Sequence, residues 1–267
     1  MGEFDGRLRC YRPIMDLVFP RICVLCRTPI VEADCESICA DCIGQITATE
    51  QRCLRCSAPQ GSRILYGNAD RKSCYYCERR KWSFRRALCY TAYSGTAARV
   101  AKKIKQPAHE ALAILFGNRI GDWLKQLETV NTELIDIVVP VPQHWFRRIT
   151  IRYNQADVLA ENIAKRLGLA LNRHCLFRTR WTEKQGTKSI ADRLNGVRNS
   201  FACRPSTKIA GKRILLVDDV VTSGATAHDA ARALRAAGAR RVEVAAFARG
   251  VGAFDKSVVK SLKKCDE

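Results

Sequence analysis

The sequence predicts an α/β protein that contains a doubly wound parallel sheet and begins with a small cysteine-rich module. Three observations lead to this prediction: apolar runs of strand length, helical patterns after two of them, and four closely spaced cysteine pairs. The apolar runs are residues 134–141, 213–217 and 241–247. Such runs, buried on both faces, are typical of parallel sheets that have helices on either side.

Two helical segments support the same fold. Residues 155–167 place their apolar side chains on one face. The alanine-rich residues 226–237 are followed by Gly238, a residue well suited to end a helix. In open parallel sheets, ligands bind beyond the carboxyl ends of the strands. We therefore expect the functional residues in the loops that follow the strands.

The composition combines an ordinary core with an unusually basic surface. Of the 267 residues, 47% are hydrophobic and 27% are charged, yet the formal net charge is +20. A basic surface attracts polyanions such as phosphorylated small molecules, nucleic acid or anionic lipid, although a solvated surface with no dedicated partner is the alternative. No apolar run approaches the roughly 18–20 residues of a membrane span, and the N-terminus lacks the order of a secretory signal. We expect a cytoplasmic protein without a transmembrane segment.

The cysteine-rich module predicts structural zinc. Eight of the fourteen cysteines form four C-x-x-C pairs: Cys23/Cys26, Cys39/Cys42, Cys53/Cys56 and Cys74/Cys77. Two such pairs can complete a tetrahedral Zn²⁺ site, so one or two ions are expected. The simplest pairing joins the first two pairs around one ion and the last two around another. Cross-braced ligands, disulfides and a redox pair are the alternatives. We expect this module to span residues 1–82 and the larger domain residues 83–267.

A basic segment with aromatic residues lies just past the last cysteine pair. Basic side chains interleaved with aromatic rings suit single-stranded nucleic acid, which offers phosphates and stackable bases. The alternative is an inter-domain linker whose aromatic rings pack against the core. The candidate nucleic-acid contacts are Arg79, Arg80, Lys81, Trp82, Arg85 and Arg86.

Residues 214–226, ILLVDDVVTSGAT, predict a pocket for a sugar phosphate. Backbone N–H groups at a helix N-terminus attract an anion, and Gly224 allows the backbone a close approach. Carboxylates at the end of a strand suit ribose hydroxyls, directly or through Mg²⁺. The stretch resembles the phosphoribosyl-diphosphate motif of type I phosphoribosyltransferases. That resemblance implies Asp218 and Asp219 as catalytic residues. It implies as ligand-binding residues Val220, Val221, Thr222, Ser223, Gly224, Ala225 and Thr226.

The chain as a whole resembles the ComF family of competence proteins, which includes the GntX-like proteins. The resemblance rests on LVFPRICVLC before the first cysteine pair, on Tyr93-Ser94-Gly95 with the lysines at 102–105, and on VVPVPQHWFRRITIRYNQADVLA. It implies that Arg147 and Arg148 lie near the diphosphate. It also implies that residues 179–198 form a flap, whose Lys184, Lys188 and Arg193 would reach the diphosphate.

Two functions follow from these observations. The resemblance implies a phosphoribosyl-diphosphate-binding protein that acts in natural transformation, where it handles incoming single-stranded DNA with a competence helicase as partner. The basic surface and the basic-aromatic segment fit this function. The alternative is an active phosphoribosyltransferase that transfers ribose 5-phosphate, with Mg²⁺, to an unidentified nitrogen nucleophile.

Overall fold

The computed structural model describes residues 20–30, 37–49, 52–58, 74, 77, 81–127, 135–143, 152–179, 199–204 and 209–250. Its contacts divide the chain into two compact units, Met1–Ile46 and Thr47–Glu267. By this division the second cysteine cluster belongs to the larger unit. The boundary expected from the sequence, between a zinc module of residues 1–82 and a domain of residues 83–267, stays a prediction.

The smaller unit is built around its cysteines. Its one described helix, α2, spans Ala40–Gly44, and an isolated bridge pairs Ile22 with Pro29. In the turn after Cys23, the Arg27 N–H donates to the Cys23 carbonyl at 2.9 Å, and Arg27 has a φ of 69°. The larger unit repeats this turn: the Ser57 N–H donates to the Cys53 carbonyl at 2.9 Å.

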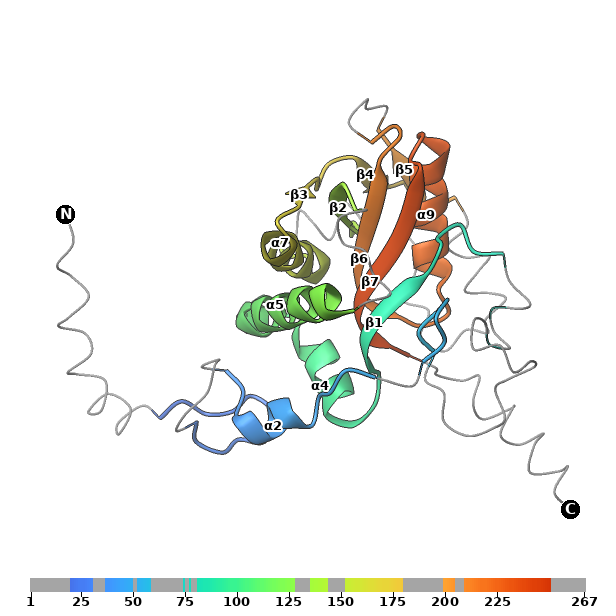
Figure 1. Cartoon of the computed structure of the whole chain (residues 1–267). Helices are drawn as coiled ribbons and strands as arrows, with labels where there is room; N and C mark the ends of the chain where they lie inside the picture. The colour runs from blue at the N-terminus through green and yellow to red at the C-terminus, as the bar shows by residue number, and fades with distance from the viewer. Residues whose placement is uncertain are drawn as a thin grey trace, which may run out of the picture. The chain divides into compact units, whose positions relative to one another are not determined.

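The larger unit contains a five-stranded parallel sheet with strand order β1-β7-β6-β2-β3 (Figure 1). The strands are β1 (Ala87–Ala92), β2 (Ile137–Pro140), β3 (Ala170–Leu171), β6 (Arg213–Val221) and β7 (Arg241–Arg249). A separate antiparallel pair joins β4 (Leu176–Arg178) to β5 (Phe201–Cys203). Every residue of β7 after the first is buried, as expected for an interior strand that is covered on both faces.

Helices cover both faces of this sheet. Figure 1 shows α5 and α7 on one side of the sheet and α9 on the other. The helices are α4 (Gly95–Lys103), α5 (Glu110–Gln126), α7 (Gln155–Leu167) and α9 (Ala225–Ala236), with a short 3₁₀ turn, η2 (Pro107–His109). From α5, Phe116 packs on Phe247 of β7 with ring centroids 4.7 Å apart. The predicted doubly wound parallel sheet is confirmed.

The bounds of α7 follow from local chemistry. The Asn154 side chain accepts a hydrogen bond from the Ala156 N–H and donates another to the Val141 carbonyl. The first bond caps the helix, and the second ties its start to the end of β2. Gly168 ends α7 with a φ of 67°, a backbone conformation that glycine adopts without a steric penalty.

The main departure from the predicted elements is the length of β6. The apolar run predicts a strand that ends at Val217, but β6 continues to Val221. The extension forms because β7 offers further partners: Asp218 lies opposite Ala246, and Val220 lies opposite Ala248. Both aspartates are therefore held in the strand itself and not in the loop that follows it.

Among the described residues, no helix combines the length and the hydrophobicity that crossing a membrane requires.

Close approach of α5 and α7 leads to a stability prediction. A Cβ added at Gly117 would lie 2.7 Å from the Asn162 Cβ and 3.1 Å from the Leu159 carbonyl oxygen. We expect Gly117→Ala to lower the free energy of unfolding by about 1–3 kcal/mol, since overpacking forces the helices apart. The free energy of unfolding is measured by urea denaturation, with circular dichroism as the signal. The control is Gly44→Ala, where an added Cβ meets nothing within 4 Å. Equal stability of Gly117→Ala and the native chain would contradict the packing described here.

Candidate functional site

The loop after β6 has the geometry of an anion site. It runs from Thr222, which is exposed, through Ser223 to Gly224, which has a φ of 77° and forms the N-cap of α9. Because α9 begins at Ala225, its first backbone N–H groups have no partner within the helix and face the loop. The helix dipole adds to their attraction for a negative charge.

Two carboxylates lie near the end of β6, separated from this loop by Val220 and Val221. The Asp219 N–H donates to Asp218 Oδ1 at 2.8 Å, and the Val220 N–H donates to Asp219 Oδ1 at 2.8 Å. The second oxygen of Asp219 lies 3.0 Å from Lys105 Nζ and accepts a hydrogen bond from Gln155 Nε2, also at 3.0 Å. Asp219 is buried, whereas Asp218 is partly exposed.

The two aspartates differ in their electrostatics. Burial and the neighbouring Asp219 charge raise the pKa of Asp218 well above its ordinary value. Burial alone would also raise the pKa of Asp219, but the Lys105 charge and the hydrogen bonds from Lys105, Asp218 and Gln155 lower it. In turn, Asp219 raises the pKa of Lys105 against the effect of burial. Lys105 is thus the cation that compensates the charge of the Asp219 carboxylate.

Lys105 and Gln155 are functional candidates that were not assigned to the site from the sequence. Gln155 also accepts a hydrogen bond from Gln143 Nε2 at 2.7 Å, so a polar chain crosses the carboxyl ends of β2 and β6. Both residues lie in stretches that carry the family resemblance, but nothing in their local sequence indicates that they converge on Asp219. Arg178, at the end of β4, lies within electrostatic reach of the same strand end: burial lowers its pKa, and the charges of Asp218 and Asp229 raise it.

A small cavity adjoins this chain at the end of β2. Its volume is about 140 Å³. Gln143 and Asn154 line it together with the basic residues Arg152 and Arg173. Arg173 also pairs with Glu161 of α7 at 2.7 Å. The cavity therefore offers hydrogen-bond donors and two arginines, together with the carboxylate of Asp157.

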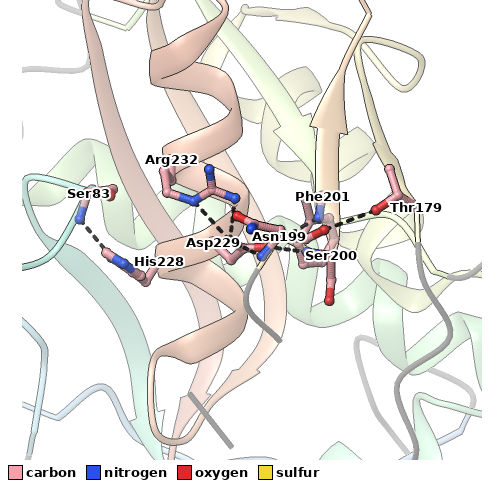
Figure 2. A network of polar contacts seen from close by, with 8 residues as sticks. All are labelled: Ser83, Thr179, Asn199, Ser200, Phe201, His228, Asp229 and Arg232. Carbon is pink, nitrogen blue, oxygen red and sulfur yellow. Dashed lines mark hydrogen bonds and ion pairs between the residues drawn. The ribbon is translucent and has the colours of Figure 1, made fainter. Parts of the chain in front are cut away.

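Asp229, in the second turn of α9, anchors the segment that leads into β5 (Figure 2). Its carboxylate accepts hydrogen bonds from the N–H groups of Asn199, Ser200 and Phe201 at 3.0, 2.8 and 3.2 Å. Arg232 donates to the same carboxylate at 2.7 Å. In addition, the Thr179 N–H donates to the Ser200 carbonyl at 2.8 Å. Residue 179, the first of the predicted flap, and residues 199–200, which follow the flap, are therefore held together.

His228, the neighbour of Asp229, anchors the basic-aromatic segment instead. Its Nδ1 accepts a hydrogen bond from the Ser83 N–H at 3.0 Å (Figure 2). The Trp82 ring stacks on Phe84 at a centroid distance of 5.1 Å and meets His228 edge-on at 6.0 Å. The structure thus packs both aromatic rings against the core, as the linker alternative describes. Nucleic-acid contact by this segment stays a prediction.

The basic residues of the segment differ in exposure. Lys81 and Arg85 are exposed, while Arg86 is partly buried and pairs with Glu243 at 3.0 Å. Several predicted site residues lie outside the described residues. They are Arg79, Arg80, Arg147 and Arg148, together with Lys184, Lys188 and Arg193 of the predicted flap.

The structure brings the eight paired cysteines together as two separate clusters. One holds Cys23, Cys26, Cys39 and Cys42, and the other Cys53, Cys56, Cys74 and Cys77, with the sulfur atoms of each within 4.8 Å of one another. A tetrahedral zinc site with Zn–S bonds of about 2.3 Å separates its sulfurs by about 3.8 Å, so each cluster fits one ion. The simplest of the predicted pairings is the one observed. Four cysteine ligands leave no open position, as in structural zinc sites.

Comparisons with known proteins agree with this arrangement. Residues 14–78 match the family model of the double zinc ribbon domain, and residues 154–266 match that of the phosphoribosyl transferase domain. A DNA utilization protein of Salmonella typhi is 27% identical over 233 residues, which cover 85% of this chain and 96% of that protein. Competence protein F of Haemophilus influenzae is 31% identical over 122 residues, which cover 45% of this chain and 53% of that protein.

Solved structures with a similar domain include the glutamine phosphoribosylpyrophosphate amidotransferase of B. subtilis. It is 26% identical and aligns with 51% of this chain and 26% of its own, with a TM-score of 0.35. A purine phosphoribosyltransferase from Pyrococcus horikoshii is 17% identical and aligns with 51% of this chain and 74% of its own, with a TM-score of 0.33.

The central strand of the parallel sheet carries two aspartates near its carboxyl end and is followed by a glycine loop. Together with the matching family model, this arrangement defines a phosphoribosyltransferase-type domain. The two cysteine clusters add a double zinc ribbon. The chain is a homologue of competence protein F and of the DNA utilization proteins, which confirms the predicted resemblance to the ComF family.

The Asp229 network leads to a second stability prediction. Each buried N–H group that loses its acceptor costs about 1–3 kcal/mol, so we expect Asp229→Ala to lower the free energy of unfolding by roughly 3 kcal/mol or more. Arg232→Ala is the matched control, because its partly exposed side chain contributes under about 1 kcal/mol through the ion pair. Urea denaturation compares the two variants. Similar losses in both would show that the ion pair, and not the backbone bonds, stabilises this junction.

Proposed function

We propose that the chain binds phosphoribosyl diphosphate, with Mg²⁺, at the carboxyl end of β6. The observation that carries this proposal is the sequence of groups along the strand end: two carboxylates, an exposed threonine and a glycine at the N-terminus of α9. Carboxylates suit the ribose hydroxyls and Mg²⁺, and the helix N-terminus suits the 5′-phosphate.

The groups around the loop support the same ligand. Lys105 and Arg178 bring positive charge to the two aspartates, and Arg152 and Arg173 bring it to the cavity at the end of β2. A diphosphate carries several negative charges and would be stabilised by these side chains. In this proposal Arg147 and Arg148 add to the diphosphate site, and Asp218 and Asp219 orient the ribose.

Binding of phosphoribosyl diphosphate is the direct test. We expect the native chain to bind it in the presence of Mg²⁺, and the double variant Asp218→Asn/Asp219→Asn to bind roughly ten- to a hundredfold more weakly, since charged hydrogen bonds to the ribose and the metal are lost. Isothermal titration calorimetry measures both. Asp122→Asn, a partly exposed residue of α5 that pairs with Arg166, is the matched control and should bind as the native chain does. Unchanged binding by the double variant would remove the basis of the proposal.

We further propose that the protein acts in the uptake or use of DNA by contacting single-stranded DNA, in the cytoplasm and with a competence helicase as partner. Relatives named for competence and for DNA utilization support this proposal, as does the net charge of +20. The cytoplasm suits two cysteine clusters whose thiols must stay reduced to hold zinc.

A basic surface at the amino ends of the strands is the best candidate for the DNA contact. The Arg240 N–H donates to the Lys212 carbonyl, and the Arg85 N–H donates to the Val242 carbonyl, so the starts of β1, β6 and β7 lie side by side. We call this surface the amino-edge patch. Its members are Arg85, Arg86, Lys212, Arg213, Arg235, Arg240 and Arg241.

The charge of the amino-edge patch is only partly compensated. Glu243 pairs with Arg86 and Arg241, and Asp136 pairs with Arg213. Four members are exposed: Arg85, Lys212, Arg235 and Arg240. Burial lowers the pKa of Arg241, the Glu243 charge raises it, and the charges of Arg85 and Arg86 lower it, so several positive charges lie close together here. The amino-edge patch and the carboxyl end of β6 lie at opposite ends of the strands, so DNA and phosphoribosyl diphosphate would bind at separate sites on one sheet.

Salt dependence tests the patch. We expect Arg85→Ala/Lys212→Ala/Arg240→Ala to weaken binding of a single-stranded oligonucleotide. The slope of log K against log salt should fall in magnitude by about 2, because a variant that loses three phosphate contacts releases fewer counterions on binding. Fluorescence anisotropy measures the slope. The control, Lys125→Ala/Lys165→Ala/Arg166→Ala, removes the same charge from α5 and α7. An equal loss in both triple variants would indicate a response to net charge and not to this patch.

Phosphoribosyl transfer is a second candidate function. The cavity at the end of β2 supports it, since a pocket of about 140 Å³ lined by amide, arginine and aspartate side chains offers an acceptor both hydrogen-bond donors and acceptors. In such a transfer a nitrogen nucleophile forms a bond to C1 of the ribose while the bond to diphosphate breaks. Release of diphosphate on addition of a nitrogen nucleophile would favour this function over binding alone.

A further inference from the structure

Arg249, the last residue of β7, links the second cysteine cluster to the phosphate loop. Its side chain is buried, with 5% of the residue exposed. Arg249 Nε donates to the Cys56 carbonyl at 2.8 Å, and Nη1 donates to the Val221 carbonyl at 2.9 Å. The same nitrogen also contacts the carbonyl oxygens of Thr222 and Gly250. One guanidinium therefore binds a cysteine turn and the start of the loop at the same time.

A second contact between the same two parts runs through Trp82. Its ring packs both on the cluster around Cys53 and on the core that holds Val221 and Ala225. A Cβ added at Gly224 would lie 2.9 Å from the Trp82 ring, so the indole rests directly on the glycine of the loop. Two side chains, Arg249 and Trp82, thus connect the second cysteine cluster to the loop.

The hydrogen bonds of Arg249 orient the peptide groups of the loop. The C=O and N–H of a planar trans peptide point in opposite directions. Because Arg249 holds the carbonyls of Val221 and Thr222, the N–H groups of Thr222 and Ser223 point away from it. An anion site needs such N–H groups fixed in advance, since their ordering otherwise reduces affinity.

Charge balance makes this arrangement depend on the metal. The acceptors around Arg249 are backbone carbonyls, which carry no net charge. A zinc site made of one Zn²⁺ and four thiolates has a net charge of minus two, and one of its ligands would be Cys56, whose carbonyl Arg249 binds. A buried guanidinium is costly without a nearby negative charge. Loss of zinc would therefore weaken the position of Arg249 as well as that of the cysteine turn.

We propose that Arg249 is a positioning residue through which zinc at the second cysteine cluster holds the phosphate loop in its binding conformation. The inference rests on the proposed function only for the identity of the ligand. The mechanical link between cluster and loop is independent of it.

Hydrogen–deuterium exchange tests the link without any ligand. We expect Cys74→Ser, which removes a ligand of the second zinc, to speed exchange in residues 222–226 roughly tenfold or more through local opening. The matched control, Cys26→Ser, removes a ligand from the cluster of the unit Met1–Ile46 and should leave these amides unchanged. Unchanged exchange in Cys74→Ser, or equal acceleration in both variants, would overturn the proposal.

Arg249→Lys tests the residue itself and keeps all eight cysteine ligands. Lysine retains the charge but cannot bind acceptors on two sides with a planar fork. We expect two zinc ions per chain, faster exchange in the loop, and a roughly tenfold rise in the dissociation constant for phosphoribosyl diphosphate. Native loop protection in a zinc-loaded Arg249→Lys chain would overturn the proposal. If the native chain fails to bind the ligand while loop exchange still responds to zinc, the proposed function is wrong and the link stands.

Discussion

The structure depends on a carboxylate that is buried at the end of its central strand. Asp219 cannot stay ionised there unless other elements compensate its charge, because isolated buried charges are very costly. Lys105 arrives after α4, and Gln155 arrives as the first residue of α7. Their bonds to one carboxylate bring three distant parts of the chain together at the strand end. Structural stability and the geometry of the candidate site therefore share the same contacts.

The helix that follows the loop has a second organising role. His228 and Asp229 are neighbours in sequence, yet they point to different parts of the molecule. His228 receives the segment that comes from the second cysteine cluster, and Asp229 receives the backbone that enters β5. With Arg249 on the adjacent strand, these residues connect the loop to the zinc module and to the base of the predicted flap. A displacement of any of these parts would therefore act on the loop through direct contacts.

The sequence predicted some elements closely and missed others for identifiable reasons. Helix α7 has the predicted bounds because its apolar spacing, the Asn154 cap and Gly168 all agree. Helix α5 was not among the predicted elements, and its two inward glycines explain why. Gly117 and Gly121 weaken the local helical signal, but they let α5 approach α7 closely. Such residues are favourable only once the partner helix is in place, which a local pattern does not reveal.

The sequence by itself determined the fold class, the four cysteine pairs of the zinc module, and the order of two aspartates followed by a glycine loop. Each of these follows from residue spacing along a short segment. Only the tertiary structure decided that Lys105 and Gln155 meet Asp219, that Arg249 joins Cys56 to Val221, and that Trp82 packs inward. These contacts join residues far apart in the chain. Burial and charge compensation select them, and both exist only after the sheet and helices have assembled.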